Sequence, residues 1–181
     1  MSNPIFVVPY DTHWPEQFAA LVGPLRAALG PAALRIDHIG STSVPGLDAK
    51  PVIDIQLSVA AVEPMNSYLG QLEGVGYAWH PFNDDLTRRF FREPSGQQRT
   101  HLHVKSAGSW SEQMALLFRD YLRTHGAAAQ RYAALKHQLA ERFRDDRPAY
   151  TNAKAPLIWE LLREADEWCR LTGWSPGPSD A

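Results

Sequence analysis

The sequence predicts an α+β fold, with a small mixed β-sheet, helices packed on one face of that sheet, and a helical C-terminal half. Three observations predict it. Residues 52–58 and 99–105 each alternate polar and apolar side chains, as strands with one polar face do. Apolar residues recur at helical spacing before the first of these strands. They recur at that spacing again through most of the chain after residue 113.

The composition is that of one globular domain. Hydrophobic residues make up 44% and charged residues 21% of the 181 residues, and a chain of this length can bury a proper core. We expect a single domain over residues 1–173 and a disordered tail, rich in Pro, Gly and Ser, over residues 174–181. The net charge of −2 gives no general attraction to nucleic acid.

The number of cysteines and the hydropathy of the chain indicate the cellular compartment in which the protein works. The single cysteine, Cys169, excludes an internal disulfide and fits a reducing compartment. No apolar run reaches the length of a membrane span, and residues 1–4 do not begin a signal peptide. We therefore expect a cytoplasmic protein without a membrane partner. The sequence leaves the oligomeric state open.

The first helix and the first two strands follow from apolar spacing and stop signals. Asp11 or Thr12 can cap a helix that has Pro15 in its first turn and ends at Gly30. Its inward positions are Trp14, Phe18, Leu21, Leu25 and Leu29. A strand over 34–39, a loop of small residues over 40–46 and a strand over 52–59 are expected next.

The middle of the chain predicts one helix and three short strands. The helix covers 62–74 and is closed by Gly74 and Gly76. The strands cover 77–80, 88–93 and 99–105, separated by a polar loop over 81–86 and a hairpin turn over 94–98.

The remainder of the chain is expected to be helical. Two apolar stripes predict two helices, the first with Met114, Leu117, Phe118, Tyr121 and Leu122, the second with Tyr132, Leu135, Leu139 and Phe143. Pro148 opens a third helical segment that continues to Trp168. Pro156 lies inside this segment and is expected to kink or divide it.

The functional prediction depends on residues 38–57, HIGSTSVPGLDAKPVIDIQL. The loop offers Gly40 and the hydroxyls of Ser41, Thr42 and Ser43, and such a loop forms a concavity that binds anions. Asp54 follows on an apolar strand, where a carboxylate needs a metal, a cation or a hydrogen-bond donor. The segment therefore predicts a phosphate cradle beside a ligand for Mg²⁺ or Mn²⁺. The alternatives are a plain turn at Gly40 and Ser41, and an Asp54 paired with an arginine.

At these residues the chain resembles the nucleotidyltransferase superfamily, whose pattern is Gly-Ser followed by Asp-x-Asp/Glu on a strand. More specifically, HIGSTSVPGLDAKPVIDI is similar to the signature of the GrpB family, also called UPF0157. Further segments typical of that family are RRFFR (88–92), THLHV (100–104), LLFRDYLRTH (116–125), YAALKHQLAERF (132–143) and YTNAK (150–154). The resemblance implies a minimal nucleotidyltransferase core with a helical extension, and ATP or another nucleotide as ligand or substrate.

The resemblance also implies which side chains face the ligand. The candidates for nucleotide or phosphate binding within these segments are Lys50, Arg88, Arg119, Lys136, Tyr150 and Lys154. Tyr150 would share a helix face with Lys154, and surface solvation is the ordinary alternative for each basic residue. One departure is that the second carboxylate of the superfamily falls at Gln56, whose neutral amide oxygen is a poorer magnesium ligand.

Strand alternation groups the candidate catalytic side chains. Asp54 and Gln56 share one face of the strand over 52–58, and His101 and His103 share one face of the strand over 99–105. If both strands lie in one sheet, these four side chains form the floor of an active site. Asp54, Gln56 and His103 are then the candidate metal ligands, or the histidines act as acid and base. His38 can join them from the preceding strand. The alternative is an ordinary solvated sheet face.

Three functions stay open. The first is a nucleotidyltransferase-like enzyme in which Ser41 and the Gly40 amide hold the phosphates and Asp54 holds the metal. The second is a non-catalytic module that binds a small anion, with a metal site broken at Gln56; the resemblance supports it, because GrpB-like domains also occur fused to a coenzyme A biosynthesis kinase. The third is a metal-dependent hydrolase or transferase built on the histidines. All three predict a small-molecule or nucleotide partner. A further carboxylate, from Asp37, Asp48, Asp84 or Asp85, can fold back toward Asp54.

Overall fold

The computed structural model describes residues 4–82 and 85–181. The expectation that residues 1–4 do not begin a signal peptide falls mainly outside this range, as does Asp84 as a further carboxylate. Among the described helices, none combines the length and the apolar character that crossing a bilayer requires.

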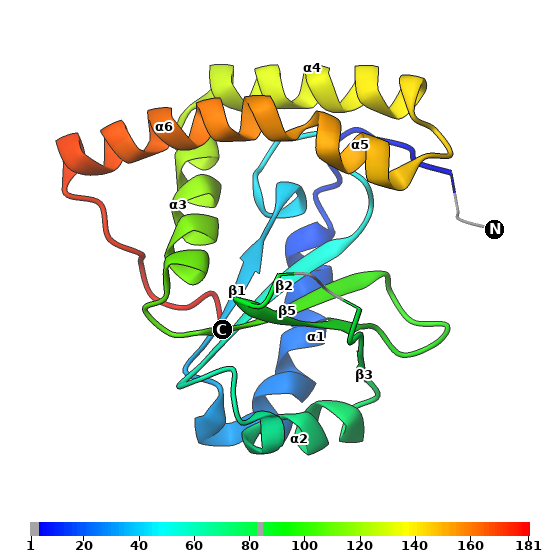
Figure 1. The fold of residues 1–181 in the computed structure, drawn as a ribbon, viewed down its shortest axis with the longest axis vertical. Helices are drawn as coiled ribbons and strands as arrows, with labels where there is room; N and C mark the ends of the chain where they lie inside the picture. The colour runs from blue at the N-terminus through cyan, green and yellow to red at the C-terminus, as the bar shows by residue number, and fades with distance from the viewer. Residues whose placement is uncertain (1–3, 83–84) are drawn as a thin grey trace.

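A five-stranded mixed sheet forms the centre of the fold (Figure 1). Its strands are β1 (Arg35–Ile39), β2 (Ile53–Val59), β3 (Ala78–Trp79), β4 (Arg88–Arg92) and β5 (Thr100–Ser106), in the order β1-β2-β5-β4-β3. The central pair β2 and β5 is parallel, and the other pairs are antiparallel. The register places Asp54 opposite His101 and Gln56 opposite His103. This register confirms that the polar sides of the two strands share one face.

The apolar face of the sheet packs on α1 (Trp14–Leu29) and α2 (Leu69–Gly74), as the predicted fold class requires. The core on this face includes Trp14, Leu25, Ile55 and Leu102, all at most 1% exposed. The helix expected over 62–74 is shorter than predicted. Its first part is a 3₁₀ turn, Met65–Ser67, separated from α2 by Tyr68, whose φ of −145° lies outside the helical range. Tyr68 is fully buried, and its hydroxyl donates to the carbonyl of Val62 at 2.6 Å.

Four helices form the C-terminal half: α3 (Trp110–Thr124), α4 (Gly126–Arg142), α5 (Arg147–Ala153) and α6 (Ala155–Thr172). The expected break at Pro156 is confirmed, since α5 ends and α6 begins on either side of Lys154. In Figure 1, α4, α5 and α6 lie across the top of the molecule, and α3 descends from them beside the sheet. The start of α3 covers part of the polar face, where Gln56 donates to the Glu112 carbonyl and Lys105 to the Ser111 carbonyl. The polar face is therefore open only near Asp54.

The segment 174–181, expected to be disordered, instead lies along β1 in the structure. Figure 1 shows it returning past α3 to the sheet. Ser179 Oγ accepts from the Ile36 amide and donates to the Ile36 carbonyl, at 2.9 and 2.8 Å. The Asp180 carboxylate accepts from the His38 amide at 3.0 Å and from Arg119 at 2.7 Å. These contacts satisfy backbone groups that an edge strand would otherwise leave open.

His38 lies on the apolar face, so its expected approach to the other histidines is wrong. Strand alternation puts it on the side opposite Asp37, where its ring stacks on Phe18 at 4.8 Å between centroids. Its Nε2 lies 3.0 Å from the Thr42 hydroxyl. Burial lowers the pKa of His38 to about 4.

We expect acid to destabilise the fold through His38. The unfolded imidazole titrates near its ordinary pKa of about 6.5, so between pH 6.5 and 4 the unfolded state binds the proton first. The free energy of unfolding should fall by up to about 3 kcal/mol as pH drops from 7 to 4. Urea unfolding at pH 7, 5.5 and 4 measures it. His38→Gln should have a shallower pH dependence than the parent, and an equal slope would contradict the assignment.

Candidate functional site

A cleft of about 530 Å³ lies over the open part of the polar face. Its floor is formed by β2, β4 and β5, one wall by the loop after β1, and the opposite wall by α4, α5 and the start of α6. A cleft of this size can take a small-molecule ligand. It brings together most of the predicted site residues, namely Gly40, Ser41, Thr42, Lys50, Asp54, Arg88, His101, His103, Lys136, Tyr150 and Lys154.

Gly40 is the close-contact point between the loop and Asp54. Its φ of +71° is a conformation that side-chain-bearing residues rarely adopt. A Cβ at this position would lie 3.0 Å from both Cβ and Cγ of Asp54, and closer still to its carboxylate. The loop therefore approaches the aspartate because residue 40 has no side chain. Ser41 and Thr42 line the cleft directly after it.

Asp54, His101 and His103 form a hydrogen-bonded cluster on the floor of the cleft. His101 Nδ1 lies 3.0 Å and His103 Nε2 lies 3.5 Å from Asp54 Oδ1. Burial raises the pKa of Asp54, but the hydrogen bonds from His101 and His103 outweigh burial and leave the pKa well below its usual range. Asp54 is therefore a carboxylate at neutral pH, and both imidazoles donate to it.

Arg88 determines the tautomer of His103. Its Nη1 lies 2.7 Å from His103 Nδ1, and because a guanidinium can only donate, Nδ1 must accept. The proton of His103 is then on Nε2, which faces Asp54. Burial lowers the pKa of His103 to about 4, which keeps the ring neutral in this arrangement. His101 donates to Asp54 through Nδ1, so its Nε2 has a free lone pair and can accept a proton.

All four lysines of the chain lie around this cleft. Lys50, Lys136 and Lys154 line it, and Lys105 lies next to it below α3. They contact aromatic rings and a carbonyl: Lys50 and Lys154 lie 5.2 and 4.7 Å from the Tyr150 ring, and Lys136 donates to the Asp48 carbonyl. Burial and neighbouring positive charges lower the pKa of Lys50 to about 8 and of Lys136 to about 7. Ammonium groups that are clustered and partly shielded from water attract an anionic ligand, because it supplies opposite charge.

Three predicted site residues lie outside the cleft. Ser43 donates through its hydroxyl to the Gly40 carbonyl at 2.6 Å and so stabilises the turn. Gln56 is fully buried beneath α3 and donates to the Glu112 carbonyl at 3.4 Å. Arg119 is 4% exposed and pairs with Asp120 and Asp180 at 2.7 Å each. Their expected ligand roles are not supported, because secondary structure and α3 packing direct these groups into the protein.

The donor set at Asp54 does not fit the paired-carboxylate magnesium site of the superfamily. Among the described residues, the side chains that could together hold a metal ion are those of Asp54, His101 and His103, whose ligand atoms lie within 4.8 Å of one another. The other candidate carboxylates are held elsewhere: Asp37 by Arg35 at 2.9 Å, Asp48 by His137 at 2.9 Å and Asp85 by Arg88 at 3.1 Å. Mg²⁺ prefers oxygen ligands, and His103 presents a protonated nitrogen to Asp54 while Arg88 contacts it.

Four residues without a predicted ligand role also line the cleft: Arg92, Tyr132, Arg147 and Thr151. One signal was available for Arg147. It precedes Tyr150 by three residues on α5, and residues at that spacing share a helix face. With it, six basic side chains and one carboxylate line the cleft; the basic ones are Lys50, Arg88, Arg92, Lys136, Arg147 and Lys154.

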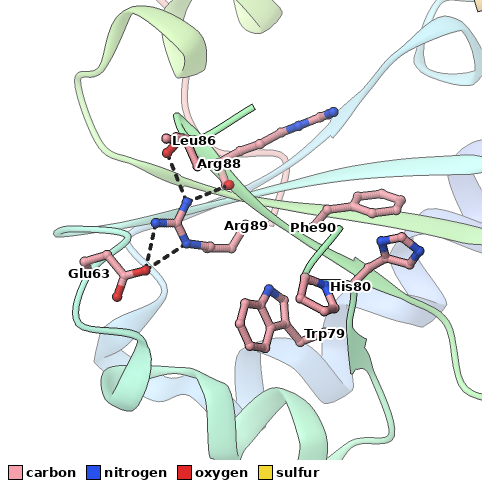
Figure 2. A pocket seen from close by; sticks show the side chains of 8 residues that line it. Glu63, Trp79, His80, Leu86, Arg88, Arg89 and Phe90 are labelled. Carbon is pink, nitrogen blue, oxygen red and sulfur yellow. Dashed lines mark hydrogen bonds and ion pairs between the residues drawn. The ribbon is translucent and has the colours of Figure 1, made fainter. Parts of the chain in front are cut away.

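A smaller cavity of about 210 Å³ lies beyond β4 and is lined by Trp79, His80, Leu86, Arg89 and other residues (Figure 2). The Arg89 guanidinium is fully engaged there, with Glu63 at 2.7 Å and with the carbonyls of Leu86 and Arg88. Figure 2 shows the Arg88 side chain pointing away from this pair. Arg89 thus holds β4 against the segment before α2 rather than offering donors to a ligand.

One family model matches most of the chain. The model described as "GrpB protein" matches residues 4–164. The chain belongs to the GrpB family. A GrpB relative, UPF0157 protein PA4798 of Pseudomonas aeruginosa, is 43% identical over 164 residues, covering 89% of this chain and 67% of the relative.

Other relatives of this GrpB chain are longer. The dephospho-CoA kinase of Mycolicibacterium paratuberculosis is 30% identical, and the match covers 96% of this chain but 49% of the kinase. The chain thus spans about half the length of that relative. The Bacillus subtilis protein YqkA, at 34% identity, is matched over 47% of its length.

Solved structures agree with the family and the fold. The crystal structure of conserved protein GrpB from Enterococcus faecalis matches with a TM-score of 0.81 and 33% identity, over 90% of this chain and 99% of that one. A structure of the Cid1 poly(U) polymerase with bound MgGTP matches with a TM-score of 0.53 and 14% identity, over 75% of this chain and 45% of that one. The second likeness shows that this GrpB chain shares the fold of a nucleotidyltransferase.

Proposed function

We propose that this chain binds a nucleotide or another phosphate ligand in the cleft and acts on it as a nucleotidyltransferase-like transferase. The observation that carries the proposal is the gathering of three of the four lysines at a cleft with one carboxylate. Lysine is rarely buried, because dehydrating an ammonium group costs free energy. Lys136 is 3% exposed and donates to the neutral carbonyl of Asp48, and an anion in the cleft would add opposite charge beside it.

Tyr150 adds a second feature that supports a ligand. It lines the cleft, is fully buried, and its hydroxyl has no hydrogen-bond partner among the described residues. An unpartnered buried hydroxyl costs free energy, and a phosphate oxygen would satisfy it. Together with the Gly40–Ser41 loop, the hydroxyl and the ammonium groups would surround a phosphate group on several sides.

The chemistry next to the phosphate would be acid–base catalysis by His101. Asp54 accepts from His101 Nδ1, which holds the imidazole in the tautomer with a basic Nε2. His101 would take the proton of an acceptor hydroxyl, and Asp54 would stabilise the imidazolium that forms. Asp54→Asn should remove that stabilisation and lower turnover by at least about a hundredfold.

Binding is expected to persist without a divalent metal. The cationic side chains supply the charge, and the donor set at Asp54 fits magnesium poorly. Titration calorimetry with ATP in EDTA should give a Kd within about threefold of that in Mg²⁺ or Mn²⁺. Loss of binding in EDTA would instead indicate a metal ion at Asp54, as the sequence predicts.

Binding should weaken at alkaline pH. Lys136 and Lys50 have lowered pKa values of about 7 and 8 in the free protein, and a bound phosphate raises them. Affinity therefore falls as pH rises through 7 and 8, because the free protein must then take up protons to bind. A phosphomonoester has constant charge above pH 7.5. Its affinity should drop at least about tenfold from pH 7.5 to 9.5, and a flat profile would contradict lysine as the main contact.

A non-catalytic binding module is the second candidate. The burial of Gln56 beneath α3 favours it, because the second metal ligand of the superfamily is then missing from the cleft. The match to one half of a dephospho-CoA kinase is compatible with an accessory role. Pyrophosphate release from the four nucleoside triphosphates, measured with a filtered small-molecule extract as acceptor pool, distinguishes the two. A transferase releases pyrophosphate and its Asp54→Asn variant does not, whereas a module binds the nucleotides unchanged.

A further inference from the structure

A second cavity adjoins the lysine-lined cleft at Asp54. It has a volume of about 280 Å³ and lies between the polar face of the sheet, α3 and α6. Gly40, Asp54, Arg88 and His103 line both spaces, so the two adjoin at the Asp54 carboxylate. We call this second space the apolar lobe, after the six apolar side chains of its wall: Ile39, Met114, Ala115, Phe118, Ile158 and Leu162. Lys105 also lines it.

The two parts of the site differ in chemistry. The cleft presents ammonium and guanidinium groups, whereas the wall of the apolar lobe away from Asp54 is hydrocarbon and thioether except at Lys105. Met114 and Leu162 are half-buried, and among the described residues neither belongs to one of the three buried apolar clusters. Two long apolar side chains on facing helices thus leave surface that an apolar group can cover.

We propose that the natural ligand is an amphipathic anion, whose phosphate lies among the lysines and whose apolar group fills the apolar lobe. The proposal rests on phosphate binding in the cleft. Because the two spaces adjoin at Asp54, a group that extends from the phosphate past Asp54 would enter the apolar lobe. Lys105, at the edge of the lobe, already donates to the Ser111 carbonyl at 2.6 Å and so does not make it a second anion site.

A series of n-alkyl phosphates tests the proposal. Inorganic phosphate and the methyl, propyl, butyl and hexyl phosphates are titrated into the full chain by calorimetry. Each methylene that enters the lobe should raise affinity about two- to fourfold, so that hexyl phosphate binds at least about 30-fold more tightly than methyl phosphate. An affinity that is independent of chain length overturns the proposal while leaving phosphate binding in place. A failure of every member to bind, inorganic phosphate included, overturns the proposed function and this inference with it.

Matched variants locate the effect. Leu162→Gln should flatten the dependence on chain length, because an amide in the lobe removes apolar contact. Leu171→Gln, on the same helix at a position 80% exposed, should keep the full dependence. Lys136→Met should weaken every member and keep the dependence. If Leu162→Gln leaves the dependence of affinity on chain length intact, the alkyl group does not bind in the lobe and the proposal is wrong. If Leu162→Gln changes the oligomeric state in sedimentation, a second copy of the chain covers the lobe, and the proposal is wrong as well.

Discussion

Gly40→Ala is expected to lower the free energy of unfolding by about 2–4 kcal/mol and to abolish ligand binding in the cleft. Two costs add. A side-chain-bearing residue at φ +71° is strained, and the new methyl group would overlap the Asp54 side chain, whose Cβ and Cγ lie 3.0 Å from its position. Asp54 is held by His101 and His103, so it cannot move aside without breaking those hydrogen bonds. Thermal unfolding should show a decrease in Tm of roughly 5–15 °C.

Gly46→Ala is the matched control. Gly46 has a φ of +76°, and a Cβ there would have no heavy atom within 4 Å. It carries the backbone cost of about 1–2 kcal/mol without the overlap, and it should keep ligand binding. If the two variants lose the same stability and both still bind, the close contact between Gly40 and Asp54 has no functional role.

Lys136→Met is expected to weaken binding of a nucleoside triphosphate by about 10- to 100-fold. A charge-assisted hydrogen bond to a phosphate contributes about 1.5–3 kcal/mol, and Lys136 is nearly buried, where water screens the charge least. Methionine keeps most of the aliphatic volume over the Tyr132 ring, which Lys136 contacts at 4.7 Å. Because the ammonium group is dehydrated in the free protein, the variant should be at least as stable as the parent.

Arg142→Met is the control for Lys136→Met. It removes one positive charge from the same helix at an exposed position outside the cleft. Calorimetric titrations of both variants at one ionic strength should show little change for Arg142→Met. Equal losses in both would mean that affinity follows total charge rather than a contact in the cleft.

Periodicity was sufficient to predict the sheet and its polar face. The alternation around Asp54 and around His101 depends only on backbone geometry, and the pairing of the two strands then places Asp54 opposite His101. The helices of the C-terminal half followed from their apolar stripes, and Pro156 gave the boundary between α5 and α6.

Periodicity could not predict contacts between segments that are distant in the sequence. Gln56 is on the predicted face, yet the start of α3 covers it, and no pattern in either segment indicates that packing. Arg119 is inside a family-like segment but pairs with Asp180, 61 residues away in sequence. The composition of the Pro/Gly/Ser-rich tail predicts disorder, yet Ser179 and Asp180 accept hydrogen bonds from backbone amides of β1.

The distribution of lysine has a practical consequence for work with this protein. Amine-directed reagents normally modify many scattered surface positions, but here the ε-amino groups are at the cleft or directly beside it. Three of them, Lys50, Lys105 and Lys136, have pKa values lowered to about 8 or below, so a substantial fraction of each is deprotonated and nucleophilic near pH 8. Dye labelling, glutaraldehyde cross-linking, reductive methylation before crystallisation and amine coupling to a sensor chip would therefore block the binding site. Attachment through Cys169, on α6 and away from the cleft lining, leaves it open.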